Sequence, residues 1–217
     1  MPKIAIPIFF LVLVSFVLAF SFYQAPCLPD KLASHWSLSG EVNGYMDKFW
    51  GLFLMPIISL VLAVMFLLLP KIDPLKENMA KFRKYYHLFI LLVLLFLFYL
   101  YLLTLAWNTG FRFNMPQFLS PAFGVLFYAA GVLTSKAKRN WFVGIRTPWT
   151  MSSDFVWDKT HELGGKLFKT TGLLSLLGIF FPQHAIFLVL TPSLFSALGT
   201  IVYSYLLHRK ETNARTS

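Results

Sequence analysis

The chain has 217 residues, of which 57% are hydrophobic and only 13% are charged, with a formal net charge of +10. Soluble domains carry about 25% charged residues, and a soluble fold of this length could not hide so much apolar surface. The composition therefore excludes an ordinary soluble domain and predicts an all-α membrane protein. Because the basic residues lie between apolar runs, they indicate membrane topology and contact with anionic lipids, and direct nucleic-acid binding is not expected.

About six transmembrane helices are expected from apolar runs that could cross ~30 Å of hydrocarbon. These runs are 4–23, 49–69, 87–107, 115–134, 167–181 and 185–207. The first resembles a secretory signal only weakly, so we interpret it as an uncleaved span. The fifth is short, and we expect it to begin inside the helix before it or to tilt. We divide the chain into 1–70, two spans with their loop, and 71–217, four spans with a longer loop, within one integrated membrane domain.

The positions of the basic residues predict the topology. If the N-terminus is cytoplasmic, only Lys31, Lys48 and Arg112 of the 19 Lys and Arg fall in outer loops. Such a bias places both termini on the cytoplasmic side. No charged residue lies in the middle of a span, which argues against a pump with a midplane carboxylate.

The segment 24–50 is predicted to be a compact extracellular loop. Ser39-Gly40 and Asn43-Gly44 are turn signals, so a small hairpin that packs on the helix ends is expected.

His35 and Trp36, with Gly40 and Lys48, are the candidate binding residues of this loop, because they offer hydrogen bonds, contact area and charge. Alternatively, Trp36 anchors the loop at the headgroup layer. A metal site is not expected, since the candidate ligands follow no known zinc or calcium spacing. These candidates are Asp30, His35, Glu41 and Asp47.

The segment 135–166 is predicted to be a cytoplasmic loop followed by a short amphipathic interfacial helix at 153–163. Ser152 or Ser153 would be its N-cap, and the helix would lie flat at the membrane surface before the fifth span.

Three acids at four-residue spacing share one face of that helix: Asp154, Asp158 and Glu162. They require neutralisation, for which Arg146 is the first candidate partner and Lys159 and Lys166 are alternatives. An ion pair of Arg146 with Asp158 or Glu162 would tie the loop to the helix. Alternatively, Arg146 binds an anion, or Asp158, His161 and Glu162 bind a cation.

No familiar catalytic motif is present. His161-Glu162 begins like a zinc-protease motif, but position 165 is Gly instead of His. The chain also lacks a nucleophile elbow, a phosphate-binding loop and a paired-cysteine site. The sequence therefore demands neither an enzyme nor a cofactor.

Both long loops resemble the SdpI immunity family. In the cytoplasmic segment the matching residues are Asn140, Gly144, Ile145, Arg146, Thr147, Pro148, Trp149, Thr150, Val156, Trp157, Lys159, Thr160, His161, Gly164 and Gly165. In the outer loop they are Leu28, Pro29, Asp30, Lys31, His35, Trp36, Gly40, Gly44 and Lys48. One departure is Ala33, where the family pattern leads us to expect proline and hence a more rigid loop.

The resemblance implies a multi-pass bacterial plasma-membrane protein that protects its producer against a secreted, membrane-active peptide toxin. The outer loop would then meet the toxin, and the cytoplasmic motif, including Asp158 and Glu162, would sense or transmit that event. The resemblance also implies that a transcriptional repressor is held at the inner face. The alternatives are a membrane-embedded enzyme or carrier acting on a lipid or peptide at the inner interface, and a receptor that only sequesters a soluble partner.

Overall fold

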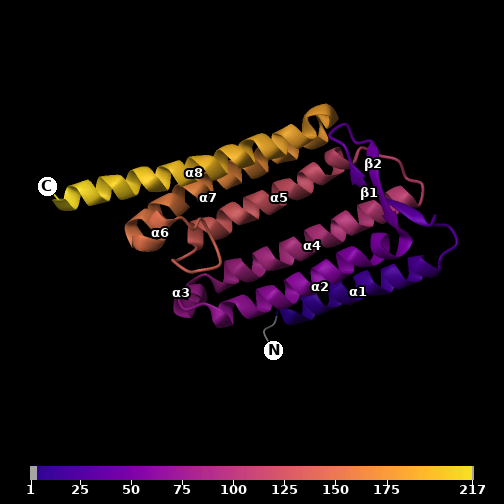
Figure 1. Ribbon diagram of the computed structural model, residues 1–217, viewed down its shortest axis with the longest axis horizontal. Helices are drawn as coiled ribbons and strands as arrows, with labels where there is room; N and C mark the ends of the chain where they lie inside the picture. The colour runs from indigo at the N-terminus through magenta and orange to yellow at the C-terminus, as the bar shows by residue number, and fades with distance from the viewer. Residues whose placement is uncertain (1–3, 217) are drawn as a thin grey trace.

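A computed structural model describes residues 4–216, with side chains described as far as residue 214. Six long helices and one β-hairpin account for most of it (Figure 1). The long helices are α1 (Ala5–Gln24), α2 (Lys48–Ile72), α4 (Arg83–Asn108), α5 (Met115–Lys136), α7 (Asp154–Leu176) and α8 (Ala185–Thr216). The short elements are α3 (Lys76–Lys81), α6 (Pro148–Ser152) and two 3-10 turns, η1 (Leu177–Ile179) and η2 (Pro182–His184).

The long helices make this a multi-pass membrane protein. Within the described residues, five helices are long and apolar enough to cross a bilayer, namely α1, α2, α4, α5 and the segment Pro182–Ala214, which covers most of α8. The sixth long helix, α7, falls outside this set because its first half is polar. The all-α membrane fold is therefore confirmed, and length and composition alone support five of the six expected spans.

The fifth apolar run begins inside the helix that precedes it, as expected, and an interfacial helix distinct from it is not confirmed. Instead, α7 is one continuous helix from Asp154 to Leu176, in which the polar segment and the fifth apolar run are two halves. The Ser153 side chain caps it by accepting a hydrogen bond from the Val156 amide. The two glycines in its middle do not interrupt it, and each allows a close contact: Gly164 packs against the Ile145 side chain, and Gly165 packs against α5.

The helices form two groups of three, α1–α2–α4 and α5–α7–α8, which are joined along α4 and α5. The second group contains a glycine seam, which we define as Gly124 and Gly131 of α5 facing Gly172 and Gly165 of α7. A Cβ atom on Gly131 would lie 2.7 Å from the Gly165 carbonyl oxygen, and one on Gly172 would lie 2.6 Å from the Gly124 oxygen. Small residues let transmembrane backbones approach closely, and this seam does so without side chains between them.

Polar small residues join α7 to α8. The hydroxyls of Thr171 and Ser196 lie 3.0 Å apart in the interior, and Thr200 is buried beside them on α8. Each hydroxyl also bonds a carbonyl one turn earlier in its own helix, so no buried oxygen of this pair lacks a partner. The sequence pattern of Ser and Thr on these two helices therefore marks a helix–helix contact.

The hairpin lies at one end of the helices, and α3, α6 and the connection after α5 lie at the other (Figure 1). We call these the hairpin end and the loop end. The start of α1 and the end of α8 both lie toward the loop end. With 32 residues, α8 is the longest helix, and its last turns extend beyond the other elements there.

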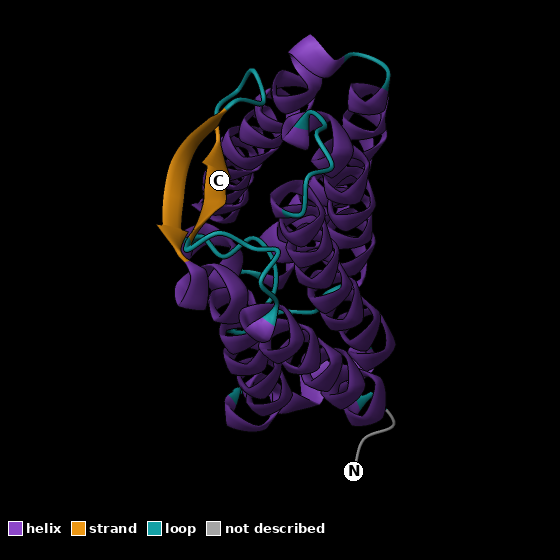
Figure 2. Cartoon of the chain, turned by 90° about the vertical axis from the view of Figure 1, so that its right-hand side faces the viewer, coloured by secondary structure: helices purple, strands orange, loops and turns teal. Residues whose placement is uncertain are grey.

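The hairpin pairs β1 (Lys31–Trp36) with β2 (Val42–Asp47) in antiparallel fashion and lies along one side of the helix ends (Figure 2). An isolated hairpin is marginal in water, so docking must stabilise it. The Asn108 side chain accepts a hydrogen bond from the Ala33 amide at 2.8 Å and donates one to the Ala33 carbonyl at 3.1 Å. A proline at position 33 would have no amide proton for this contact. The predicted compact loop is confirmed, and Asn108 pins it to the end of α4.

Candidate functional site

The hairpin end brings His35 and Trp36 to the rim of one cavity of about 300 Å³. His35 is exposed, and its Nδ1 donates a hydrogen bond to the Asn43 Oδ1 at 2.5 Å. His35 lies opposite Gly44 in the hairpin, and a Cβ atom added to Gly44 would lie 2.8 Å from the His35 Cβ. In the neutral ring the other nitrogen, Nε2, is then a hydrogen-bond acceptor.

Trp36 is half-buried and packs edge-on against Trp107, with ring centroids 5.8 Å apart. Its indole N–H is buried and has no hydrogen-bond partner among residues 4–216. Buried indole N–H groups usually find a partner, so this one is an unusual feature of the cavity. Trp36 therefore packs within the folded hairpin end through Trp107.

Gly40 and Lys48 lie away from that cavity. Gly40 has φ +88° in the hairpin turn, and the Asn114 side chain packs against it and donates to the Ser39 carbonyl at 2.9 Å. The Lys48 ammonium donates to the Ala25 carbonyl at 2.9 Å, which closes the loop between α1 and β1. Of the four predicted outer-loop residues, the structure thus gathers two and gives the others contacts that shape the loop.

At the loop end, His161 is the centre of a buried polar cluster. Its Nδ1 donates to the Trp157 carbonyl at 2.8 Å, and its Nε2 accepts from the Ile145 amide at 3.0 Å. It stacks on the Trp157 ring, and the Trp157 indole N–H donates to the Ala137 carbonyl at 3.0 Å. His161 lies in the polar half of α7, before the apolar residues 167–176. Burial there lowers the pKa of His161 to about 4, so the ring is neutral at physiological pH.

The connection 137–147, which we call the motif loop, folds around Asn140. The Asn140 side chain is fully buried and makes four hydrogen bonds: it donates to the Lys138 and Val143 carbonyls and accepts from the Phe142 and Val143 amides. Gly144 follows with φ +113°, and a Cβ atom there would overlap the His161 Nε2. Gly144 and His161, both predicted from the sequence, therefore form a close contact between the motif loop and α7.

The Thr147-Pro148-Trp149-Thr150 turn fixes α6 against α8. Thr147 and Thr150 form a capping box, and Pro148 occupies the first turn of α6. The Thr147 hydroxyl lies 3.1 Å from that of Ser204, and the Trp149 ring packs on α8 through Tyr205.

The Thr160 hydroxyl is buried in α7, with no hydrogen-bond partner in the described part of the chain.

The predicted ion pair of Arg146 with Asp158 or Glu162 is wrong, because no such pair is formed. Arg146 is exposed and its guanidinium donates to the Trp141 carbonyl within the motif loop. The acids are neutralised by nearer cations: Lys138 lies 3.1 Å from Asp158, Arg139 lies 3.0 Å from Asp154, and Lys166 lies 3.0 Å from Glu162. The hydrogen bond and charge of Lys166, together with Lys159, lower the pKa of the Glu162 carboxyl.

The four residues of the enzyme or carrier alternative do not converge. His161 is inside the protein, Asp158 and Glu162 are exposed with separate lysine partners, and Arg146 extends along the loop. Among the residues that the structure describes, no group of three His, Cys, Asp or Glu side chains could hold a metal ion.

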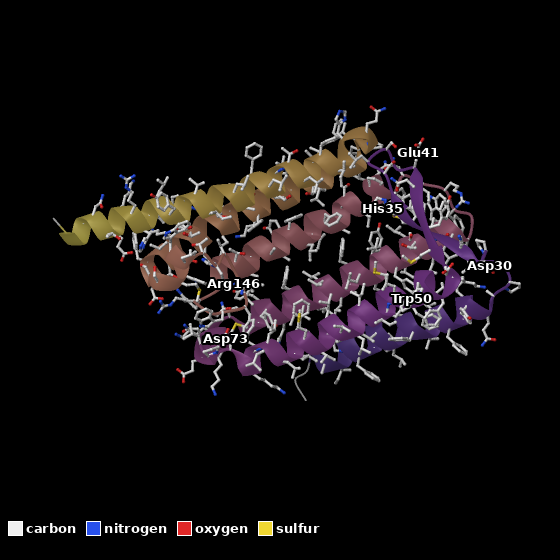
Figure 3. The ribbon with its side chains drawn as sticks, in the orientation of Figure 1. Asp30, His35, Glu41, Trp50, Asp73 and Arg146 are labelled. Carbon is white, nitrogen blue, oxygen red and sulfur yellow. The ribbon has the colours of Figure 1, made fainter. Side chains whose placement is uncertain are left out.

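Two residues of the α2–α3 corner hold the motif loop and were not singled out in the sequence. Asp73 is 2% exposed; its Oδ1 accepts from the Leu75 amide at 2.7 Å and its Oδ2 from the Trp141 amide at 3.0 Å. The Asn78 side chain donates to the Arg139 carbonyl at 2.8 Å. Asp73 and Arg146 both lie at the loop end, while His35 lies at the opposite end (Figure 3). The Asp-Pro pair at 73–74 after an apolar run was the available signal for a structured corner.

Comparison with known proteins finds similarity in both regions. The model of the SdpI/YfhL protein family matches residues 136–204, which include the motif loop, α6 and α7. A model described as a domain of unknown function (DUF1648) matches residues 10–60, which include the hairpin. The chain is 23% identical over 206 residues to Immunity protein SdpI of Bacillus subtilis (strain 168), covering 94% of this chain and 96% of that protein. No solved structure matches.

Proposed function

Because the chain belongs to the SdpI/YfhL protein family, we propose that it is an immunity protein that protects its cell against a secreted, membrane-active peptide toxin. The observation that carries this proposal is the similarity to Immunity protein SdpI along nearly the whole chain, with both long loops inside the aligned region. The proposal includes a topology with both termini in the cytoplasm, so that the hairpin faces the toxin. The distribution of Lys and Arg supports this orientation.

The contacts of the motif residues favour immunity over the enzyme or carrier reading. His161 uses both ring nitrogens within the fold, and the acids of α7 are each paired with a lysine or arginine. A general base or a ligand site needs at least one of these groups to face a reacting molecule. The motif instead ties the motif loop, α6, α7 and α8 into one unit.

A survival assay tests the proposal. Wild type, His35→Ala and Glu41→Ala would be expressed at matched membrane abundance in a sensitive bacterium and challenged with the peptide toxin of the Bacillus subtilis relative. We expect wild type and Glu41→Ala to protect and His35→Ala to protect less, because Glu41 is equally exposed on the hairpin but lies outside the cavity. No survival with well-expressed wild type would reject immunity against that toxin.

An inner-face partner is a second element of the proposal, and it rests on Arg146. This arginine has no carboxylate partner among the described residues, and the neighbouring Trp141 is 52% exposed, so charge and aromatic surface meet on the motif loop. A transcriptional repressor held there would explain that surface. In a host carrying a repressor-controlled reporter, Arg146→Ala should abolish the toxin-dependent reporter response and leave survival intact, whereas Lys136→Ala should change neither. An unchanged response in Arg146→Ala would remove this surface from signalling.

A further inference from the structure

The cavity at the hairpin end is built from both helix groups. Strand β1 and the following turn form its outer rim, and side chains of α2, α4, α5 and α8 form its walls. The walls are largely apolar and include Met55, Leu100, Leu119, Phe123 and Val189. Its volume of about 300 Å³ is at the lower end of the ~300–1,000 Å³ typical of ligand pockets. It can hold a short apolar group, not a folded partner.

Two polar groups at the rim give the cavity a specific chemistry. The Trp36 indole supplies a buried N–H that has no acceptor among residues 4–216. In its neutral form the His35 ring supplies Nε2 as an acceptor, because its Nδ1 donates to Asn43. Trp36 and His35, which both line the apolar chamber, therefore carry one unpaired donor and one acceptor.

We propose that this cavity binds an apolar side chain of the peptide toxin together with the adjoining backbone amide. A peptide unit carries one carbonyl acceptor and one N–H donor, which match Trp36 Nε1 and His35 Nε2. The ester groups of a phospholipid are acceptors only and leave the histidine nitrogen unused. The proposal rests on the immunity function, and it adds the place and the chemistry of toxin recognition.

Thiol protection tests the site directly. On a Cys27→Ser background, Ser34→Cys places a thiol at the cavity wall and Ser39→Cys places a matched thiol on the exposed turn. Each variant would be purified into phospholipid nanodiscs, and its modification by a maleimide would be timed with and without the toxin. We expect the toxin to slow modification of Ser34→Cys ~10-fold or more and to leave Ser39→Cys unchanged, since only a bound ligand shields the first thiol.

A second pair of variants tests the hydrogen bond. Trp36→Phe keeps an aromatic ring and removes only the N–H, whereas Trp50→Phe makes the same change at an exposed tryptophan outside the cavity. With the Ser34→Cys reporter, Trp36→Phe should raise the toxin concentration for half-protection by ~3–10-fold, as expected for one lost hydrogen bond. Trp50→Phe should leave it unchanged.

The outcomes separate this site from the immunity function. If the toxin shields neither thiol while wild type still protects cells, toxin recognition lies elsewhere and the cavity proposal is overturned. If Ser34→Cys is unreactive in nanodiscs without toxin but reactive in detergent, a lipid chain fills the cavity and the peptide assignment is wrong. Toxin-dependent shielding in a protein that fails to protect cells would support the site and reject immunity.

Discussion

At the scale of single residues, Gly144 and His161 make the tightest contact of the motif loop. Gly144 has φ +113°, and a methyl group there would overlap the ring nitrogen that accepts the Ile145 amide. Gly110 has nearly the same backbone conformation, φ +112°, but a Cβ atom added there would have no neighbour within 4 Å. An alanine at either position would strain the backbone, but only an alanine at position 144 would also overlap a neighbouring atom.

We predict that Gly144→Ala lowers the free energy of unfolding by about 1–3 kcal/mol more than Gly110→Ala, because overpacking adds to a shared backbone cost. Thermal unfolding of the two variants in detergent measures the difference. Equal melting temperatures would show that the motif loop yields to the methyl group and is not held by His161.

The buried His161 also makes stability depend on pH. Burial lowers its pKa from 6.5 to about 4 in the folded state, so the unfolded chain binds the proton first as the pH falls. Stability is therefore complete above the unfolded pKa and declines as the pH drops toward the folded pKa. The His161→Gln variant has no titratable group at this position. Between pH ~7 and ~4, we therefore expect the free energy of unfolding to fall by about 3 kcal/mol more in the wild type than in His161→Gln. If the free energies of unfolding of wild type and His161→Gln fell equally with pH, this account would be contradicted.

At the scale of helices, the glycine seam decides how closely α5 approaches α7. A Cβ atom on Gly131 would lie 2.7 Å from backbone atoms of both Gly165 and Lys169, which cannot turn aside as a side chain can. Gly199 on α8 has nothing within 4 Å and serves as the matched control.

We predict that Gly131→Ala destabilises the protein by about 2 kcal/mol, because the helices must separate, whereas Gly199→Ala is neutral or stabilising by up to ~1 kcal/mol. Melting of each variant in the same detergent gives the comparison. A neutral Gly131→Ala would mean that α5 and α7 pack less closely than described.

At the scale of the whole molecule, the hairpin and the motif loop lie at opposite ends of the helices, and both make contacts between the two helix groups. Asp73 links the α2–α3 corner to the Trp141 amide at one end, and Asn114, the N-cap of α5, holds the hairpin turn at the other. A ligand that enters the cavity between the groups therefore acts on the same boundary that the motif loop bridges.

The single cysteine reports the orientation of this assembly. Cys27 is exposed at the hairpin end, and Ser152 is exposed in α6 at the loop end. In intact cells we expect an impermeant maleimide to modify Cys27 in the wild type, and to modify Cys27→Ser/Ser152→Cys only after permeabilisation. The reverse pattern would invert the proposed topology.

Local sequence signals predicted much of this fold, and distant contacts account for the rest. Apolar runs located the long helices, and the turn signal at Ser39-Gly40 located the hairpin turn, because both depend on neighbouring residues. The second turn signal, Asn43-Gly44, was wrong, because these residues lie inside β2 opposite His35. The partner of Arg146 was mispredicted because Lys138 and Arg139, at the start of the motif loop, pair with Asp158 and Asp154 instead. The supports from Asp73 and Asn78 come from more than 60 residues away, a separation over which no periodic pattern is informative.

The length of α8 has a practical consequence. Its 32 residues span ~48 Å at 1.5 Å per residue, against ~30 Å of hydrocarbon. Roughly a third of this helix therefore extends beyond the hydrocarbon core, with Arg209 and Lys210 along it. A fluorescent protein fused to the C-terminus would be held outside the hydrocarbon core, where it could report partner binding without being attached to either loop.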